Sequence, residues 1–333
     1  MVMYKIIMFN VREEEMDLAK KWAAAHDVEV ELHSESLTLD NAELVKGFDG
    51  LSVTQTSHVK EEMYPLLKTY GIKQIAQRTA GVDFYDLDLA RKNGLIISNV
   101  PMYSPESIAE FAVMSTLRLI RKVDAIKEYV QDYDFRWQTP VEGRVLGEMT
   151  VGIVGTGHIG MTAAKIFKGY GCKVIGYDLY PNEANEAILT YQDSIEELVS
   201  QADIVSLHLP ATKDNYHEFD KELFKHFKKE AYLINTARGQ IVDTKDLLAA
   251  IDEGQLAGAA LDTYEYEAPY VRRNNKEAEI HDETLMELIH SKKVCYTPHV
   301  AFYTGKAVAN MMKTGLEATL EVIKTGDTKY RVN

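Results

Sequence analysis

The chain has 333 residues, 46% of them hydrophobic and 26% charged, with a formal net charge of −14 at pH 7. This length exceeds what one compact core usually serves, so two domains are expected. The acidic balance argues against general nucleic-acid or anionic-membrane binding. An anionic ligand must therefore be attracted by local groups and not by the overall charge.

The first hundred residues alternate between short apolar strands and helical stretches. Strands are predicted at 4–9, 28–32, 50–54, 72–76 and 95–99, and helices at 13–26 and 61–69. Such alternation predicts a parallel sheet with helices on both faces.

A boundary is predicted at Asn99-Val100-Pro101, followed by a strong helix start at Ser104-Pro105-Glu106. A serine cap, a proline in the first turn and a nearby acid are typical of a helix N-terminus. The helix is expected to run to about Tyr129 and is apolar on most sides. It should be buried, either between domains or between subunits.

The next segment predicts a second parallel sheet. Further strands are expected at 150–154, 173–178, 202–208, 231–235, 258–261 and 294–296. The last helix, about 305–324, has no obvious partner among these strands, so we expect it to cross back to the first domain.

The glycine pattern after the strand 150–154 is Gly155-Thr156-Gly157-His158-Ile159-Gly160. Gly155 permits a sharp turn, Gly157 lets a pyrophosphate approach the backbone, and Gly160 lets the new helix, expected at 161–170, lie close to the strand. The N–H groups at the start of that helix would face the phosphates. Strand, glycine turn and helix together predict a dinucleotide site.

Asp178 ends the following strand, 18 residues after Gly160. An acid at this position is suited to bind the adenosine ribose hydroxyls, although it could also be a simple turn residue. No arginine follows it closely to hold a 2′-phosphate, which favours NAD over NADP.

Four polar residues lie at or just beyond the predicted ends of later strands, where ligands bind in open parallel sheets: Arg238, Asp262, Glu267 and His299. An arginine can bind a carboxylate through two parallel hydrogen bonds and polarise the adjacent keto oxygen. A histidine can donate the proton that a new hydroxyl needs, and a carboxylate beside it fixes its orientation. These types suit hydride transfer to a 2-keto acid, with the hydride from NADH.

Each of these residues also has a purely structural interpretation. Arg238 could pair with a surface acid, Glu267 could be a solvated member of an acidic run, and His299 could be a buried histidine with satisfied hydrogen bonds. His208, also at a strand end, is a rival acid–base candidate.

Four segments carry a resemblance to a known family, over nearly the full chain: Gly155–Gly160, Leu233–Gly239, Leu261–Glu267 and Thr297–Tyr303. The chain resembles the D-isomer-specific 2-hydroxyacid dehydrogenases, and within them most closely the D-lactate dehydrogenases of lactic-acid-type bacteria. The resemblance implies that Arg238 binds and activates the substrate and that His299 is the acid–base group paired with Glu267. It also implies D stereochemistry and a homodimer, with the helix from Pro105 in the interface.

The same resemblance implies further contacts. On the cofactor side they are Gly155, Gly157, His158, Ile159, Gly160, Asp178, Leu209, Pro210, Asn215, Thr236, Ala237, Arg238 and Asp262. On the substrate side they are the backbone amides of Ala80 and Gly81 together with Tyr103, Arg238, His299 and Phe302. For Asp262 a strand-end cap, and for the two aromatic residues core packing, remain alternatives.

The segment Ser52-Val53-Thr54-Gln55-Thr56 departs from the family pattern, because related D-lactate dehydrogenases often have a bulky aromatic residue there. Smaller side chains would leave a roomier pocket, so a D-2-hydroxyisocaproate-type dehydrogenase acting on larger 2-keto acids is an alternative. A methylene group discriminates by only about 1–3 kcal/mol, so overlapping substrates are expected.

Other relatives of this fold are less favoured. A phosphoglycerate dehydrogenase would usually have a regulatory domain, and a formate dehydrogenase would pair its histidine with glutamine, where this chain has Glu267. An NAD-sensing, non-catalytic corepressor-like protein is the alternative from a different class.

The predicted fold is α/β, with two doubly wound, Rossmann-like parallel sheets and an active-site cleft between the domains. Residues 1–100 and 300–333 are expected to form the substrate domain, and residues 101–299 the NAD domain. No metal is expected, because the sequence has no dense His/Cys/Asp cluster.

The cysteines and the N-terminal residues predict a cytoplasmic location. Cys172 and Cys295 are the only cysteines, which is no disulfide framework and fits a reducing cytoplasm. The apolar start, MVMYKIIMFN, is short and lacks a cleavage pattern, so it predicts a strand and not a signal peptide. No apolar run is long enough to span a membrane.

Overall fold

The computed structural model describes residues 3–55 and 57–333, and the chain divides into two compact units. Unit 1 comprises Met1–Ser104 and Tyr303–Asn333, and unit 2 comprises Pro105–Phe302. Each unit contains one sheet in which every strand pairing is parallel, so the predicted α/β fold class is confirmed. In the described part of the chain, no helix has both the length and the apolar character needed to cross a membrane.

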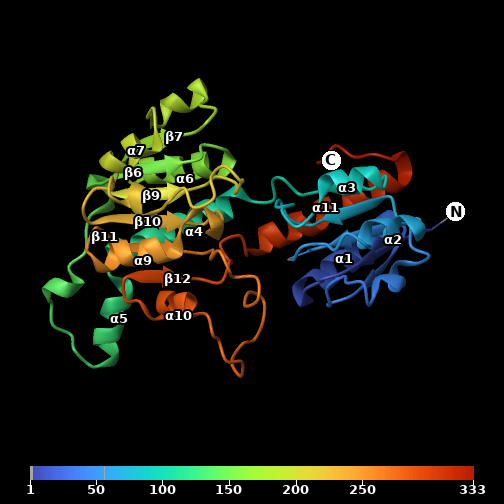
Figure 1. Cartoon of the computed structure of the whole chain (residues 1–333), viewed down its shortest axis with the longest axis horizontal. Helices are drawn as coiled ribbons and strands as arrows, with labels where there is room; N and C mark the ends of the chain where they lie inside the picture. The colour runs from blue at the N-terminus through green and yellow to red at the C-terminus, as the bar shows by residue number, and fades with distance from the viewer. Residues whose placement is uncertain (1–2, 56) are drawn as a thin grey trace. The chain divides into compact units, whose positions relative to one another are not determined.

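The sheet of unit 1, drawn in Figure 1 with the helices around it, has five strands in the order β2-β1-β3-β4-β5. The strands are β1 (Tyr4–Met8), β2 (Val28–Leu32), β3 (Gly50–Val53), β4 (Gln74–Gln77) and β5 (Ile96–Ser98). The helical segments are α1 (Glu13–His26), η1 (Ala42–Val45), α2 (Met63–Thr69), α3 (Leu87–Lys92) and α11 (Gly305–Thr325). The strand order reverses between β1 and β3, which is where such sheets bind ligands at their carboxyl edge.

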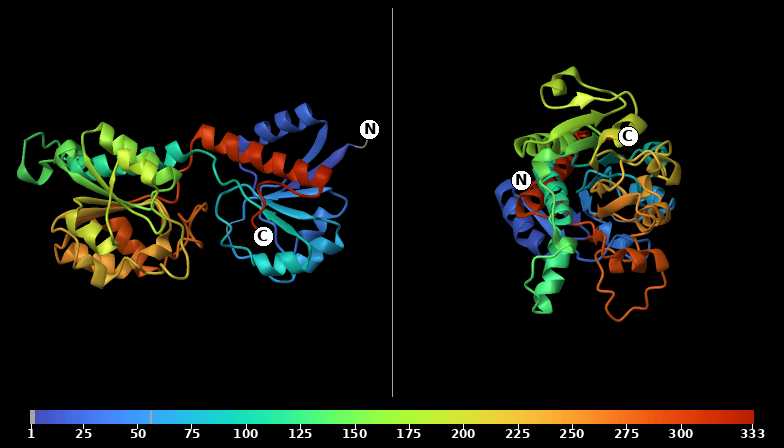
Figure 2. Two further views of the ribbon diagram at one scale, coloured as in Figure 1. Left: turned by 90° about the horizontal axis from the view of Figure 1, so that it is seen from above. Right: turned by 90° about the vertical axis from the view of Figure 1, so that its left-hand side faces the viewer.

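Successive residues of β1 face opposite sides of this sheet, as the pleat requires. Ile6 and Met8 pack in one apolar cluster with α1 and α11, while Ile7 packs in another with α2. Figure 2 shows α11 lying beside α1. A Cβ at Gly50 would lie 2.4 Å from Thr319 Cγ2, so glycine allows α11 to lie directly on β3.

The sheet of unit 2 has seven strands in the order β12-β11-β10-β9-β6-β7-β8. They are β6 (Thr150–Val154), β7 (Lys173–Tyr177), β8 (Thr190–Tyr191), β9 (Ile204–Leu207), β10 (Ala231–Asn235), β11 (Leu256–Leu261) and β12 (Val294–Tyr296). The order reverses between β6 and β9. This is the Rossmann arrangement with one additional strand, and its switch point lies beside the glycine turn.

Helices cover both faces of this second sheet through two apolar clusters. The α-helices are α4 (Pro105–Ile120), α5 (Val123–Gln131), α6 (His158–Gly169), α7 (Ile195–Gln201), α8 (Lys221–Phe224), α9 (Thr244–Asp252) and α10 (Glu283–His290). The 3₁₀ turns are η2 (Thr139–Val141), η3 (Leu146–Glu148), η4 (Glu183–Ala187) and η5 (Gly239–Ile241).

The prediction of one helix from Pro105 to about Tyr129 is wrong. Helix α4 ends at Ile120, and Lys122 adopts a left-handed conformation with φ of 54° before α5 begins at Val123. This left-handed residue interrupts the helix, which hydrophobic periodicity cannot indicate. Helix α4 packs against α6 and the sheet of unit 2, and leaves Met114 43% exposed.

Candidate active site

The glycine turn after β6 has the backbone geometry that the sequence predicts. Gly155 has φ of +88°, and a Cβ there would lie 2.6 Å from the carbonyl oxygen of His208 on the neighbouring strand end. A Cβ at Gly160 would lie 1.9 Å from the carbonyl oxygen of Gly155. Glycine is therefore required at both positions to close the turn.

Helix α6 begins at His158, three residues earlier than predicted, and Gly157 is its N-cap residue. No side chain caps this end, and a Cβ at Gly157 would meet no atom within 4 Å. The first N–H groups of the helix, with the positive end of its dipole, are thus open to a phosphate. His158 and Ile159 lie in this first turn.

Asp178 follows β7 and is fixed by three backbone and side-chain donors. Its Oδ2 accepts hydrogen bonds from Thr156 N at 2.7 Å and Thr156 Oγ1 at 3.0 Å, and its Oδ1 accepts one from Tyr180 N at 3.0 Å. Thr156 Oγ1 also lies 2.8 Å from the hydroxyl of Tyr191 in β8. A carboxylate has about four acceptor positions, so about one remains for a donor from the ribose. Tyr191 was not indicated by the sequence, because a two-residue strand leaves no periodic signal.

The other predicted cofactor residues lie at the ends of β9 and β10. Leu209 and Pro210 follow β9, and Asn215 folds the loop back on itself, because its Nδ2 donates to Pro210 O at 2.8 Å. Ala237 N donates to Asn235 Oδ1 at 2.9 Å. Thr236 Oγ1 is buried without a hydrogen-bond partner, an unsatisfied polar atom that a bound ligand could satisfy.

Arg238 lies three residues after the end of β10, where Asn235 Nδ2 donates to its carbonyl oxygen at 2.9 Å. Its guanidinium donates from Nη1 to Ala237 O at 2.8 Å. A Cβ at Gly239 would lie 2.2 Å from the carbonyl carbon of Tyr264. Only glycine allows the loop that carries Arg238 to touch the loop that carries Glu267.

His299 and Glu267 form a direct pair in unit 2. His299 Nδ1 lies 2.6 Å from Glu267 Oε1, and Glu267 Oε2 accepts a hydrogen bond from Tyr264 N at 2.9 Å. The His299 side chain is 33% exposed. With Nδ1 bound to a carboxylate, Nε2 is the ring nitrogen available to exchange a proton with a ligand.

Asp262 organises the loop on which His299 lies. Its Oδ1 accepts from Thr297 Oγ1 at 2.6 Å and from Val300 N at 3.0 Å, and its Oδ2 accepts from Ala301 N at 2.8 Å. His299 N donates to Asp262 O at 2.7 Å, which supports the left-handed φ of 58° at His299. Burial raises the pKa of Asp262 above its ordinary value, and the hydrogen bonds counteract part of this rise. Contact with a cofactor stays a prediction for this residue.

His208 is poorly suited to the acid–base role for which it was a rival. Its Nε2 lies 2.9 Å from Ser206 Oγ, and its Nδ1 is buried without a partner. Burial lowers the pKa of His208 to about 4, so its ring is neutral near pH 7. A neutral ring of such low basicity is a weak proton donor and acceptor.

The predicted substrate residues are divided between the two units. Arg238, His299 and Phe302 belong to unit 2, where the rings of His299 and Phe302 meet edge to face with centroids 6.4 Å apart. Ala80, Gly81 and Tyr103 belong to unit 1. The carbonyl oxygen of Tyr103 accepts a hydrogen bond from Asn310 Nδ2 at 2.6 Å.

The turn after β4 is tied down by its carbonyl groups. Ala80 O accepts from Asn99 Nδ2 at 2.7 Å, and Gly81 O accepts from Thr79 Oγ1 at 3.3 Å. Among residues 3–55 and 57–333, no acceptor bonds the backbone N–H of Ala80 or Gly81. Two adjacent unpaired N–H groups suit a carboxylate.

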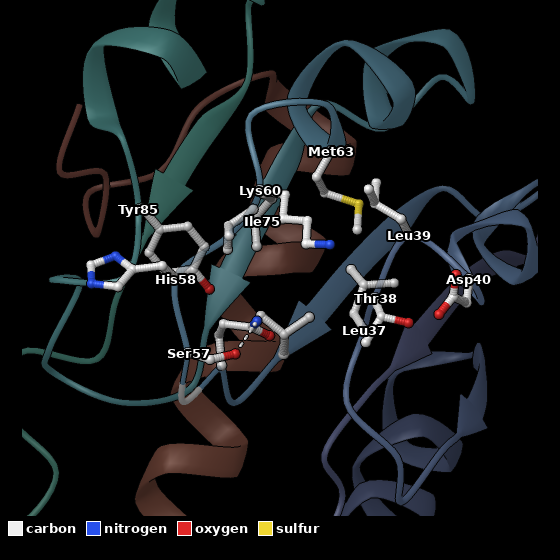
Figure 3. A pocket seen from close by; sticks show the side chains of 13 residues that line it. Leu37, Thr38, Leu39, Asp40, Ser57, His58, Lys60, Met63, Ile75 and Tyr85 are labelled. Atoms are coloured by element: carbon white, nitrogen blue, oxygen red, sulfur yellow. Dashed lines mark hydrogen bonds between the residues drawn. The ribbon is translucent and has the colours of Figure 1, made fainter. Parts of the chain in front are cut away.

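The small residues after β3 border an open space. Val53 and Gln55 line a pocket of about 300 Å³ with Leu37, Thr38, His58, Tyr85 and seven other residues, seen in Figure 3. Ser52 and Thr54 do not line it, and Thr54 Oγ1 is buried without a partner. Thr56, the last residue of this segment, lies outside the described residues.

Comparison with known proteins identifies the family. The model of the D-isomer specific 2-hydroxyacid dehydrogenase, NAD binding domain, matches residues 113–301, more than half of the chain. The chain belongs to this family. Its cofactor is NAD, and the open N-terminus of α6, the remaining acceptor position of Asp178 and the unsatisfied Thr236 Oγ1 fit that cofactor.

Individual members of the family resemble the chain over its whole length. A D-lactate dehydrogenase of Streptococcus agalactiae is 54% identical, with 99% of this chain and 100% of the relative covered. A solved D-lactate dehydrogenase from Treponema pallidum has a TM-score of 0.90 at 41% identity, with 99% of both chains covered. A solved D-2-hydroxyisocaproate dehydrogenase has a TM-score of 0.91 at 37% identity, with 98% of this chain and 99% of that chain covered.

In the part of the chain that the structure describes, no group of three or more His, Cys, Asp or Glu side chains is arranged to hold a metal ion.

Proposed function

We propose that this 2-hydroxyacid dehydrogenase catalyses the reversible reduction of pyruvate, or a related 2-keto acid, to the D-2-hydroxy acid. The observation that carries the proposal is the 2.6 Å pair of Glu267 with His299, whose loop Asp262 fixes, together with Arg238 on a loop that touches the loop of Glu267. The 54% identical relative, which is a D-lactate dehydrogenase, favours pyruvate as the substrate.

The reacting groups have complementary tasks. When bound, NADH supplies the hydride that is added to C2 of the keto acid. Arg238 binds the carboxylate and polarises the keto oxygen through its planar donors. The His299 imidazolium donates the proton that converts this oxygen to a hydroxyl, and Glu267 stabilises that imidazolium. In the reverse direction His299 accepts the proton.

In the same proposal unit 1 is the substrate domain and unit 2 the NAD domain. The backbone N–H groups of Ala80 and Gly81 bind the substrate carboxylate, and Tyr103 and Phe302 border its side chain. The absence of acceptors for these two N–H groups within the described residues supports this role. Asp178 binds the ribose hydroxyls, supported by its fixed position after β7.

Substitution of Arg238 by glutamine tests the substrate clamp. Arg238→Gln should bind NADH with nearly unchanged affinity, while kcat/KM for pyruvate falls by about 100-fold or more because the charged bidentate contact is lost. Arg91→Gln, which removes an exposed arginine paired with Asp88, is the matched control. Near-normal pyruvate reduction by Arg238→Gln would refute the assignment.

A preference for larger 2-keto acids is the second candidate function. The pocket of about 300 Å³ beside Val53 and Gln55, and the structural match to a D-2-hydroxyisocaproate dehydrogenase, favour it. Values of kcat/KM measured side by side for pyruvate and 2-ketoisocaproate separate the two. Turnover of neither would support a non-catalytic, NAD-sensing protein.

We also propose a homodimer in the cytoplasm. Helix α5 and the loop after it carry exposed apolar residues, among them Phe135 at 70% and Trp137 at 100% exposure. A patch of this kind usually marks an interface. Both cysteines are free and buried, which fits a reducing compartment.

A further inference from the structure

A series of hydrogen bonds in unit 1, buried at Gln77 and partly buried at Thr79, leads to the turn at Ala80 and Gly81. Its centre is Gln77, the last residue of β4, which is 1% exposed. Gln77 Oε1 accepts from Gln55 N at 3.0 Å and from the hydroxyl of Tyr85 at 2.7 Å. Gln77 Nε2 donates to Gln55 O at 3.1 Å and to Thr79 Oγ1 at 2.7 Å. All donors and acceptors of this amide are therefore engaged.

The backbone of Gln55 fixes which group donates and which accepts in each of these hydrogen bonds. A backbone N–H can only donate and a carbonyl can only accept, so the side-chain amide of Gln77 has one possible orientation. Thr79 Oγ1 must then accept from Gln77 and donate onward, and the acceptor it meets is Gly81 O at 3.3 Å. Tyr85 must donate to Gln77.

The turn is held at each of its carbonyl groups. Thr79 O accepts from Val100 N at 3.0 Å, Ala80 O accepts from Asn99 Nδ2 at 2.7 Å, and Gly81 O accepts from the Thr79 hydroxyl. A peptide whose carbonyl direction is fixed has its N–H direction fixed as well, because the peptide unit is planar. The carbonyls of Thr79 and Ala80 thus set the directions of the N–H groups of Ala80 and Gly81, and the Thr79 hydroxyl restrains the backbone of Gly81 from the other side, through the Gly81 carbonyl.

We propose that Gln77 and Thr79 are positioning residues for the 2-keto acid carboxylate, acting through the orientation of the Ala80–Gly81 turn. This inference rests on the proposed function. We call the hydrogen bonds that join Gln55, Tyr85, Gln77, Thr79 and Gly81 the relay. The relay starts at the wall of the 300 Å³ pocket, since Gln55 and Tyr85 both line it, and Figure 3 shows Tyr85 among the pocket side chains. It ends at the turn, which has no other side-chain support for the Gly81 carbonyl among the described residues.

The test replaces Thr79 by valine, which keeps the shape and removes the hydroxyl. Thr79→Val should raise the KM for pyruvate and the dissociation constant of oxamate, a non-reducible carboxylate analogue, by about tenfold, corresponding to about 1.4 kcal/mol. The dissociation constant of NADH and the value of kcat should change less than twofold. Thr79→Ser, which keeps the hydroxyl, should restore the pyruvate KM and the oxamate affinity.

Thr319→Val is the control, because Thr319 is a buried threonine of unit 1 whose hydroxyl donates within α11, to Gly315 O, and not toward the turn. It should leave both substrate measurements unchanged. If Thr79→Val does not fold, Tyr85→Phe removes the donor at the other end of the relay and should raise the same two constants. Unchanged constants in a folded Thr79→Val or Tyr85→Phe chain, or equal losses in the valine and serine variants, would overturn the proposal.

Failure of the proposed function gives a different result. If the unaltered chain reduces neither pyruvate nor 2-ketoisocaproate, the proposed reaction is wrong. Oxamate binding in the presence of NADH, compared between the unaltered chain and Thr79→Val, still reports whether the relay positions the turn. Equal oxamate binding in both would refute the relay by itself.

Discussion

His208 shows how burial decides the chemistry of a single residue. The ring lies at the end of β9 with one nitrogen near Ser206 and the other buried without a partner. Its pKa of about 4 lies below the ordinary value of 6.5. An unfolded chain therefore binds a proton to this histidine at pH values where the folded chain does not.

We predict that His208 makes the folded chain less stable in mild acid. Because the pKa of His208 is depressed in the folded chain, the free energy of unfolding is highest above about pH 6.5 and decreases as the pH falls toward 4. The difference between the folded and the ordinary pKa corresponds to a decrease of roughly 3 kcal/mol in the free energy of unfolding between these two pH values. His208→Gln should lack this slope, measured by denaturant unfolding at pH 7.0, 5.5 and 4.5. Parallel pH profiles of the two chains would contradict the prediction.

At this scale the sequence indicates residue types better than their partners. Arg238, Glu267 and His299 could be singled out because each follows a strand end and has suitable chemistry. The hydrogen bonds of Asp262 to the loop around His299 could not be predicted, since they join residues more than 30 positions apart. The contacts of Tyr191 with Thr156, 35 positions apart, and of Gln77 with Gln55, 22 positions apart, could not be predicted either, because they also join separate elements.

At the scale of elements, the strands were predictable because short runs of apolar, β-branched residues bounded by turn signals are typical of buried strands. The predicted strand 231–235 coincides with β10. Helix α3 and strand β8, with six and two residues, were missed because they are too short to show a period. The break between α4 and α5 was missed because Arg121 and Lys122 carry no glycine or proline signal.

We predict that NADH binding responds differently to alanine at Gly157, the N-cap residue of α6, and at Gly169, its last residue. Gly157→Ala adds a Cβ that meets no protein atom within 4 Å, so the free energy of unfolding should change by less than about 1 kcal/mol. The same Cβ occupies the space through which a phosphate reaches the helix, so NADH should bind about tenfold or more weakly. Isothermal titration with NADH measures the affinity.

Gly169→Ala is the control for that comparison, because it lies at the other end of α6 and its Cβ also meets no atom within 4 Å. Its NADH affinity should equal that of the unaltered chain, with stability raised by up to about 1 kcal/mol. Equal NADH binding by Gly157→Ala and Gly169→Ala would mean that the pyrophosphate does not approach Gly157.

At the scale of the whole molecule, the exposed apolar residues after α5 predict its state of assembly. Figure 1 shows α5 and the following loop projecting from the rest of unit 2. Trp137→Glu places a charge on a fully exposed ring position, so a dimer built on this surface should dissociate while each chain stays folded. Light scattering after size exclusion should then report 37.6 kDa for the variant and twice that mass for the unaltered chain.

Leu44→Glu tests whether any added charge has this effect, because Leu44 is an exposed apolar residue of unit 1. It should remain dimeric. A monomeric unaltered chain, or a Trp137→Glu chain that stays dimeric, would exclude this surface as the interface.

The division of unit 1 into two separate chain segments has a consequence for biosynthesis. Unit 2 is continuous in sequence, whereas unit 1 needs α11 against β3 and needs Asn333, whose side chain bonds Leu95 O and Ile97 N. Domains fold as their sequence emerges from the ribosome. The nucleotide-binding unit can therefore fold while translation continues, but the strands of the first unit must wait, with their apolar faces uncovered, until α11 and Asn333 have been made. We expect the nascent chain to need chaperones most during this interval.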